Sequence, residues 1–460
     1  MQTTFLTEQN KFSIYFIVFV AAFSGLLFGF NTGVTSGAVL FITEEFHLTA
    51  FNTSLVTSSI LFGAFISAII SGRLADRYGR RNLMIFNAIL FVFGALSSAL
   101  ASTIHGLAAS RMIVGFAVGI SSYVAPLYIS ELAPFRKRGV MVGFNQLFIV
   151  IGILLSYAID YIFFSGGHWR LMFGMGVIPA LMLLGGLLFV PESPRWLIAN
   201  DRDHEAREVL QLIHVNANVE LELLEIKGSL DEQRRDWRML LNPWLLPAVI
   251  VGFGIAALQQ LVGINIFVYY GPIILVYGGG NPANVAMLAT FGIGAILVIF
   301  TIVALPLIDR WGRRPLLLLG SVGMTLSMLT FCGIFLWLPE NSAISSWLIL
   351  IGSIVYIASF AISFGPIGWL MISEIFPLRV RGLAMSLATA TIWGFNMLVI
   401  LTFIPMIKLL HSSVVFGIYS VFCFLGLIFV YFLVPETKKI TLERIEANLR
   451  SGKPSRYLGE

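Results

Sequence analysis

Three amide side chains lie within seven residues of one apolar stretch: Gln259, Gln260 and Asn265. An amide both donates and accepts hydrogen bonds, and it does not exchange protons at physiological pH. Polar groups are costly in an apolar environment, so such a cluster indicates a function, such as holding a neutral ligand rich in hydroxyl groups. The alternative is hydrogen bonding between packed helices, the usual role of a lone Asn or Gln in such a stretch.

A second functional candidate is Arg111, a charged residue within a long apolar run. It is the first residue of the stretch Arg111–Gly119. A buried guanidinium costs at least about 2.5–3.5 kcal/mol at the centre of a bilayer, and less near its edge, so it needs oxygen partners. No Asp, Glu or His stands near the middle of any apolar run in the sequence; Asp160 stands at the end of one.

The composition indicates a membrane protein. The chain has 460 residues, of which 58% are hydrophobic and only 12% are charged, against about 25% charged in a soluble domain. Twelve apolar runs of about 20 residues follow one another, each long enough to cross a hydrocarbon core as a helix. We therefore predict an all-α fold with twelve transmembrane helices. The two cysteines fall inside apolar runs, where a small buried hydrophobic side chain is the expected role, so we expect neither a metal site nor a cofactor.

The excess of basic residues follows the membrane topology. Of the 29 Lys and Arg residues, Arg111 is intramembrane and Arg170 and Lys408 fall on the other side, which leaves 29 − 3 = 26 on the side that holds both termini. The positive-inside rule then places both termini in the cytosol. A nucleic acid is not expected as a partner; the lipid bilayer is.

The two halves of the sequence repeat. Asp76 and Asp309 each precede a Gly-Arg-Arg, Glu131 and Glu374 each begin a segment that ends in Arg-Gly, and Pro191-Glu192 returns as Pro435-Glu436. Parallel six-helix repeats of this kind build one large carrier fold, with the substrate near the midplane between them. We predict halves at residues 1–191 and 244–435, a cytosolic linker at 192–243 with short amphipathic helices, and a cytosolic tail at 436–460.

Charged residues stand at equivalent places on the cytosolic rim of both halves. They could pair across the halves and lock the cytosolic side when the cavity faces outward. Anchoring of the topology by Arg alone is the simpler alternative, but it does not explain the matched acidic residues. The predicted gate consists of Arg73, Asp76, Arg80, Glu131, Arg138, Asp309, Arg313, Glu374 and Arg381.

These motifs carry a family resemblance. Pro191–Leu197 (PESPRWL), Gln259–Asn265 (QQLVGIN) and Pro435–Glu446 (PETKKITLERIE) resemble the sugar porter branch of the major facilitator superfamily, and the similarity runs from about residue 20 to about residue 447. The resemblance implies a major facilitator fold that transports a monosaccharide, a hexose or pentose such as glucose, galactose or xylose. It implies no enzyme activity.

A sugar site needs amides for the hydroxyls and an aromatic wall for the ring face. Matching the family's motifs, we expect the substrate to bind Gln146, Gln259, Gln260, Asn265, Tyr269, Trp369, Trp393 and Asn396. Within this set, Tyr269 would act with Tyr270 as an outer lid. The sequence departs from the family at Leu297 and Ile392, where related carriers often have an amide, so the identity of the sugar stays open.

The resemblance also bears on coupling. In proton-coupled relatives a carboxylate on the first span pairs with an Arg that matches Arg111, whereas this chain has Asn31, as facilitative animal glucose carriers do. We therefore expect passive uniport. The alternative is sugar:proton symport through another acid, such as Asp160. A sugar sensor would be expected to carry a long cytosolic tail, and a membrane enzyme a catalytic dyad. We expect a monomer in a bacterial inner membrane.

Overall fold

The structure is a computed structural model that describes residues 2–133, 138–213, 219–231, 237–279, 282–339, 342–377, 380–438, 440 and 442–459. The first half consists of α1 (Gln2–Gly33), α2 (Thr35–Glu45), α3 (Ala50–Tyr78), α4 (Arg80–Ala99), α5 (Ile104–Leu132), α6 (Arg138–Phe164), α7 (Trp169–Gly174) and α8 (Val177–Leu187). The segment that follows forms α9 (Pro194–Ala199), α10 (Asp203–Ile213), α11 (Val219–Asp231) and the short 3₁₀ helix η2 (Trp237–Leu241).

The second half consists of α12 (Leu246–Leu261), α13 (Ile264–Gly279), α14 (Ala283–Trp311), α15 (Arg313–Trp337), α16 (Ala343–Ile362), α17 (Phe364–Ile375), α18 (Arg381–Leu410) and α19 (Ser412–Leu433). The chain ends in α20 (Leu442–Arg450) and η3 (Ser455–Tyr457). The described residues contain twelve helical stretches that are long and apolar enough to cross a membrane, as predicted. Four of them are built from two consecutive helices: α1 with α2, α7 with α8, α12 with α13, and α16 with α17.

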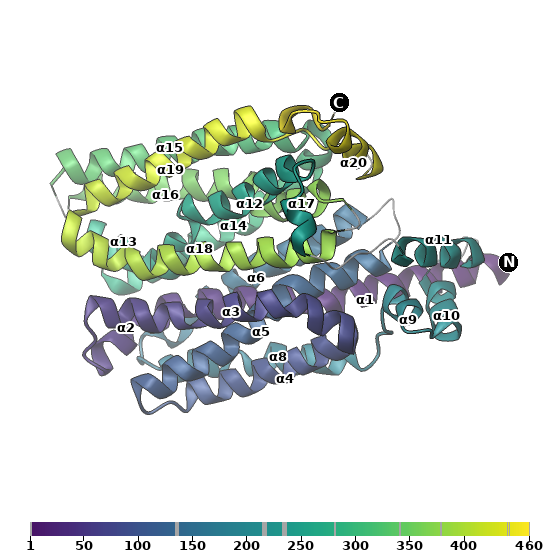
Figure 1. The fold of residues 1–460 in the computed structure, drawn as a ribbon. Helices are drawn as coiled ribbons and strands as arrows, with labels where there is room; N and C mark the ends of the chain where they lie inside the picture. The colour runs from purple at the N-terminus through teal and green to yellow at the C-terminus, as the bar shows by residue number, and fades with distance from the viewer. Residues whose placement is uncertain are drawn as a thin grey trace.

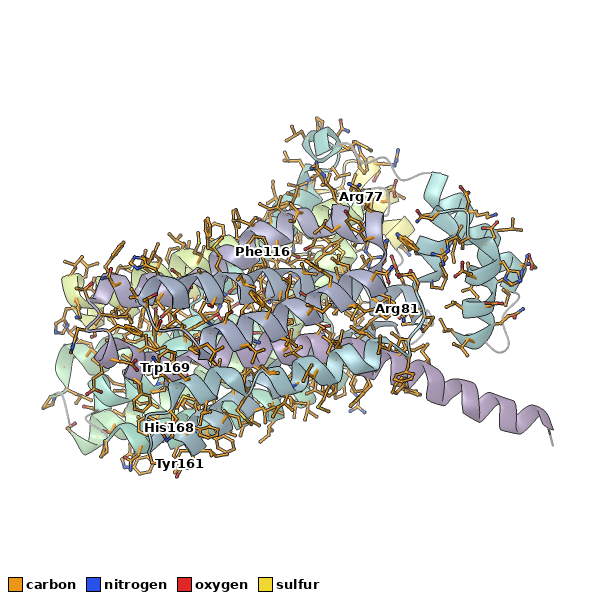
Figure 2. The ribbon with its side chains drawn as sticks, turned by 90° about the horizontal axis from the view of Figure 1, so that it is seen from below. Arg77, Arg81, Phe116, Tyr161, His168 and Trp169 are labelled. Carbon is orange, nitrogen blue, oxygen red and sulfur yellow. The ribbon has the colours of Figure 1, made fainter. Side chains whose placement is uncertain are left out.

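The two halves lie side by side as two bundles (Figure 1). Helix α3 packs along α18, and α6 packs along α14, so each half touches the other through two long helices. Both termini lie at one end of the bundles together with α9, α10 and α11 (Figure 1). We call this the terminal end. Figure 2 shows Arg77 and Arg81 toward this end, and Trp169 and His168 toward the opposite end.

The internal repeat is visible in two tight turns at the terminal end. Gly79, between α3 and α4, has φ +92°, and Gly312, between α14 and α15, has φ +96°. A Cβ on Gly79 would lie 2.3 Å from Glu192, and one on Gly312 would lie 2.5 Å from Glu436. Glycine is needed here for both its backbone conformation and its lack of a side chain.

Each of these turns is held by one carboxylate. The backbone N–H groups of the two residues after Gly79 donate to Glu192 at 2.9–3.1 Å. Those of the two residues after Gly312 donate to Glu436 at 3.0 Å. The first N–H groups of a helix have no partner within the helix, and a carboxylate can accept their hydrogen bonds. The negative charge of the carboxylate is also stabilised by the positive end of the helix dipole. The Pro-Glu motifs therefore cap α4 and α15.

Two membrane-spanning stretches of the second half are interrupted where one helix ends and the next begins. Gly263 has φ +95° and separates α12 from α13. Ser363 separates α16 from α17 with φ −123° and ψ −101°. The first interruption is stabilised by Tyr356, whose hydroxyl donates to the backbone oxygen of Val262 at 2.7 Å. Backbone that leaves the helix inside a membrane protein is tolerated where it is buried or lines a cavity.

Candidate substrate site

A cavity lies between the two halves. Its volume is about 80 Å³. Its lining comes from α1, α6, α12, α13, α14, α16, α17 and α18, so both halves contribute. Seven of the eight residues expected to bind the substrate line it: Gln146, Gln259, Gln260, Asn265, Trp369, Trp393 and Asn396.

The amides of the second half form a chain of hydrogen bonds. Asn265 Nδ2 donates to Gln260 Oε1 at 2.5 Å, and Gln260 Nε2 donates to Gln259 Oε1 at 3.3 Å. Gln259 Nε2 in turn donates to the backbone oxygens of Phe364 and Gly365, at 2.8 and 3.3 Å. The interruption before α17 thus orients Gln259, and Gln259 orients the next two amides.

Two further amides keep an acceptor free for a ligand. Gln146 Oε1 and Asn396 Oδ1 are buried and have no hydrogen-bond partner within the described part of the chain. A buried acceptor without a partner costs about 1–3 kcal/mol. Both atoms belong to side chains that line the cavity, so a ligand hydroxyl could satisfy them.

Aromatic rings form the apolar part of the lining. Phe28 and Trp393 lie with their ring centroids 5.1 Å apart. The indole N–H of Trp393 donates to Ser122 Oγ at 3.1 Å, which ties α18 to α5 across the two halves. Trp369 lines the cavity on α17, directly after its first turn. The site therefore combines amides with flat apolar faces, the combination that a pyranose ring would require.

Tyr269 is the one predicted ligand that does not line the cavity. It is fully buried, and its hydroxyl lies near Thr32 of the first half. It follows Asn265 by one turn on α13, whereas the residues of that helix that line the cavity end at Val268. Tyr270 donates to the backbone oxygen of Ile400 at 3.3 Å and so contacts α18.

Some lining residues were not among the predicted ligands. Phe28 and Thr32 come from α1, Thr301 from α14 and Phe360 from α16. Thr301 lies one helical turn after Leu297 and donates to its backbone oxygen at 2.7 Å, which leaves its own oxygen able to accept. The sequence signal for these residues was weak, because a single Thr or Phe in an apolar span is ordinary. Leu297 and Ile392, noted as departures from the family, do line the cavity.

Arg111 is buried on α5, seven residues or about 10 Å from the helix start at Ile104. Its Nη2 donates to the backbone oxygen of Asn31 at 2.6 Å and to Thr35 Oγ1 at 2.9 Å. The guanidinium carbon lies 4.7 Å from the centroid of the Phe173 ring. The side-chain nitrogen of Asn31 donates to the backbone oxygen of Leu27 at 3.0 Å. Neutral oxygens and a ring face therefore hold this cation.

Asp160 is fully buried near the end of α6. Its Oδ2 accepts the backbone N–H of Gly37 at 3.0 Å, and its Oδ1 has no hydrogen-bond partner among the described residues. A Cβ on Gly37 would lie 2.6 Å from the Asp160 carboxyl carbon and 2.4 Å from Met287 of the second half. The carboxyl group thus lies where α2, α6 and α14 meet.

At the terminal end, two arginines of the predicted gate, Arg80 and Arg313, pair within their own half. Arg80 binds Glu131 through two hydrogen bonds of 3.0 Å and lies 3.3 Å from Asp76. Arg313 binds Glu374 at 2.9 and 3.3 Å and lies 3.7 Å from Asp309. The tight turn at each glycine directs the arginine back along its own bundle, so these contacts differ from the cross-half pairs that we expected.

The other gate residues are arranged differently. Arg73 is exposed, and Arg381 is partly buried at the start of α18. The side chain of Arg138 lies outside the described residues. Contacts across the halves near this end include Ser386 Oγ, which donates to Ala68 O at 2.8 Å, and Tyr123, which donates to Gly382 O at 3.4 Å.

Ser193 and Thr437 extend the two rim clusters. The hydroxyl of Ser193 binds Glu131, and that of Thr437 binds Glu374 at 2.5 Å. Each follows directly the glutamate that caps α4 or α15, so one short motif holds both the turn and the ion pair. The repeated Pro-Glu-Ser/Thr signal was visible in the sequence, but its contact with the second glutamate was not.

Comparisons with known proteins agree with this arrangement. The family model described as "Sugar (and other) transporter" matches residues 17–449. The chain is 41% identical over 443 residues to the putative metabolite transport protein YwtG of Bacillus subtilis, with 96% of each chain covered. It is 39% identical over 454 residues to the galactose-proton symporter of Escherichia coli, with 98% of each chain covered.

A solved structure shares the whole fold. The proton:xylose symporter XylE of Escherichia coli, bound to 6-bromo-6-deoxy-D-glucose, matches with a TM-score of 0.83 and 33% sequence identity. The match covers 95% of this chain and 99% of that one. The chain therefore belongs to the sugar porter family of the major facilitator superfamily, and it is a multi-pass membrane protein that transports sugars and not an enzyme.

Proposed function

We propose that the chain carries a monosaccharide, a hexose or pentose such as glucose, galactose or xylose, across a bacterial inner membrane by alternating access. The observation that carries this proposal is the cavity between the halves, where amides and two tryptophans meet. The related symporters named above act on galactose and xylose, which supports a single sugar ring as substrate. Rocking of one half against the other around this cavity would expose it to each side in turn.

In this proposal the second half binds most of the sugar. Asn265, Gln260 and Gln259 offer a pre-oriented row of donors and acceptors, because each is already fixed by the next. Gln146 adds an acceptor from the first half, and Trp369 and Trp393 cover the ring faces. Pre-oriented groups lose little conformational freedom on binding, which favours affinity for a small ligand.

The transport is proposed to be uniport, with both termini in the cytosol. Arg111 is bound by the backbone oxygen of Asn31 and by Thr35, and neither group takes up a proton. Among the described residues, the groups that bind Arg111 thus include no acid whose protonation could follow the sugar. Without such a group, the sugar gradient alone would drive net movement.

Symport through Asp160 is a second candidate, which the geometry of Asp160 favours. Its carboxyl group is buried, has a free oxygen in the described structure and binds Gly37, beside which Met287 of the second half also lies. A proton that binds there could alter the contact between α2, α6 and α14. The galactose and xylose relatives are themselves proton symporters, which gives this alternative weight.

Uptake of radiolabelled glucose, galactose and xylose into proteoliposomes, with and without an inward proton gradient, tests both candidates. For uniport we expect equilibration without accumulation, and no change in this behaviour in Asp160→Asn. Uphill accumulation that collapses with an uncoupler and is lost in Asp160→Asn would establish symport instead. Transport of none of the three sugars would remove the proposed substrate class.

The variant Asn31→Asp sharpens the same experiment. It places a carboxylate beside Arg111, on the helix where the wild type has only neutral oxygens. We expect this variant to accumulate sugar against its gradient when an inward proton gradient is imposed. If it only equilibrates the sugar while it still transports, then position 31 does not decide coupling.

A further inference from the structure

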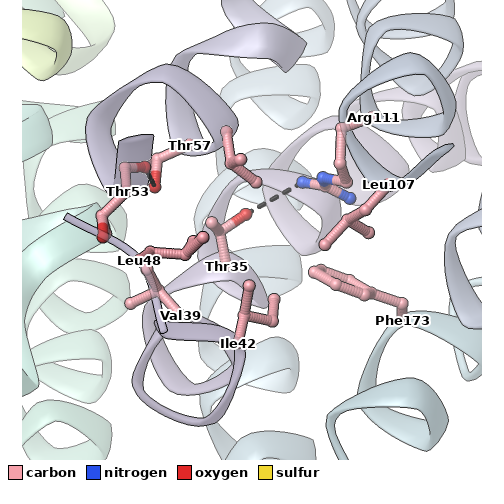
Figure 3. Close-up of a pocket in the computed structure, with 10 residues that line it drawn as sticks. Thr35, Val39, Ile42, Leu48, Thr53, Thr57, Leu107, Arg111 and Phe173 are labelled. Atoms are coloured by element: carbon pink, nitrogen blue, oxygen red, sulfur yellow. Dashed lines mark hydrogen bonds between the residues drawn. The ribbon is translucent and has the colours of Figure 1, made fainter. Parts of the chain in front are cut away.

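A second cavity adjoins Arg111 in the first half, separate from the cavity that lies between the halves. Its volume is about 10 Å³, which leaves room for one water molecule or one small ion. Thr35, Thr53 and Thr57 contribute hydroxyl groups to its wall, and side chains such as Leu107 and Phe173 close the rest (Figure 3). The guanidinium group of Arg111 faces this space (Figure 3).

Arg111 has hydrogen-bond donors to spare. A guanidinium group carries five N–H donors, two of them on Nη2. The two hydrogen bonds of Arg111 in the described structure both come from Nη2, to Asn31 O and Thr35 Oγ1. The donors on Nη1 and Nε therefore remain for a ligand in the cavity.

The positive charge of Arg111 also lacks a neighbouring anion. The rim arginines Arg80 and Arg313 each bind a glutamate in two places. Arg111 is only 2% exposed, yet its partners are a backbone oxygen, a hydroxyl and an aromatic ring. Among the described residues, the ionisable group that interacts with it is the phenol of Tyr269. A buried cation whose partners are all neutral is an unfavourable arrangement that an anion would relieve.

The threonine hydroxyls suit an anion better than a cation. In the described structure Thr53 and Thr57 donate to the backbone oxygens four residues earlier, at 3.0 and 2.8 Å. A hydroxyl rotates freely about its C–O bond, so each proton could turn into the cavity. A cation would instead meet the charge of Arg111 at close range and be repelled.

We propose that this cavity binds a small monovalent anion such as chloride, which balances the charge of Arg111 because the side chain beside it, Asn31, is neutral. The small size of the space favours a monatomic anion over phosphate, sulfate or an organic acid. The inference stands whether transport is uniport or symport, because it concerns the charge of Arg111 alone. It predicts that halide ions stabilise the protein, and that a carboxylate placed at position 31 competes with them.

Thermal unfolding of the purified full-length protein in detergent tests this, in sodium chloride against sodium gluconate at equal ionic strength. We expect chloride to raise the Tm in a saturable way, by about 2 °C or more at saturation. In Asn31→Asp the difference between the two salts should vanish. Arg170→Gln is the matched control, because it removes an exposed arginine that already pairs with Glu45, and it should keep the wild-type response.

Crystals soaked in bromide provide a readout that needs no variant. An anomalous peak within about 3.5 Å of the Arg111 guanidinium would support the site. A wild-type Tm that does not distinguish chloride from gluconate would overturn the proposal. So would a salt response that survives in Asn31→Asp, or bromide peaks at the protein surface only, which would mean that the cavity holds water.

Discussion

In the first half of the chain, Gly79 turns the backbone so that Arg80 meets Glu131; in the second, Gly312 does the same for Arg313 and Glu374. The two rims therefore match residue by residue. The interiors do not match. The second half supplies four of the five amides that line the cavity, and the first half supplies Gln146 and the buried Arg111.

The matched rims are features that both halves kept after duplication, whereas the different interiors arose separately in each half. The same rim cluster can stabilise either half, since it needs only the turn, the arginine and the glutamates of that half. The interior must bind one asymmetric molecule, so equivalent positions cannot stay equivalent. Substitutions in matched pairs can therefore test which features are truly shared.

The largest effects are expected at the rims, in Arg80→Ala and Arg313→Ala. Each substitution leaves a glutamate without its cation, with Glu131 6% and Glu374 22% exposed, which costs at most about 3–5 kcal/mol. Because the two clusters match, both variants should lower the Tm of the purified protein by similar amounts. Arg73→Ala, at an exposed arginine on the same rim, should change stability by less than about 0.5 kcal/mol.

A clear inequality between the two rim variants would break the comparison. If Arg80→Ala unfolds the protein and Arg313→Ala does not, the matched geometry hides different roles. Charge restored by Lys at either position should recover little, because a lysine cannot bind a carboxylate through two parallel hydrogen bonds.

The fold was largely predictable, because each apolar run had the length of a membrane span and the repeated motifs located the halves. The amides that line the cavity were predictable too, since an amide such as Asn265 is conspicuous in an apolar run, whereas most of its apolar lining was not. The place of Tyr269 outside the cavity lining could not be predicted, because how far the cavity extends along α13 depends on tertiary packing. The partners of Arg80 depend on how the turn directs the side chain, which is a property of tertiary structure.

Smaller effects are expected on sugar affinity, where Asn265→Ala and Gln146→Ala compare the two halves. Loss of Asn265 removes contacts to the sugar and also leaves Gln260 Oε1 without its donor. That should cost about 1–3 kcal/mol, which corresponds to a Kd weaker by about fivefold to about 150-fold. Gln146 Oε1 has no partner in the described structure, so its loss should cost only about 0.5–1.5 kcal/mol. Equilibrium binding of the transported sugar measures both.

Asn145→Ala is the control for the first half. Asn145 precedes Gln146 on α6 and does not line the cavity, so this substitution should leave the Kd unchanged. Equal losses in Asn265→Ala and Gln146→Ala would mean that the two halves share the sugar evenly. That result would contradict a site carried mainly by the second half.

The smallest effect, and the only gain, is expected from Leu297→Asn. Leu297 lines the cavity on α14, at a position where the family resemblance leads us to expect an amide. An amide there could bind one more sugar hydroxyl, worth about 0.5–1.5 kcal/mol or about a twofold to tenfold tighter Kd. A panel of monosaccharides that differ at one hydroxyl would identify which position of the ring faces α14.

The gain should depend on the sugar, because a new amide is useful only where a hydroxyl can meet it. For a sugar that lacks that hydroxyl, the added amide remains without a partner and should weaken binding. Leu297→Met keeps the apolar character and about the same volume, so it should leave the preference among sugars as it is. If Leu297→Asn shifts affinity equally for every sugar in the panel, then α14 does not contact a hydroxyl that distinguishes these sugars. The asymmetry between the halves would then lie in α12, α13, α17 and α18 alone.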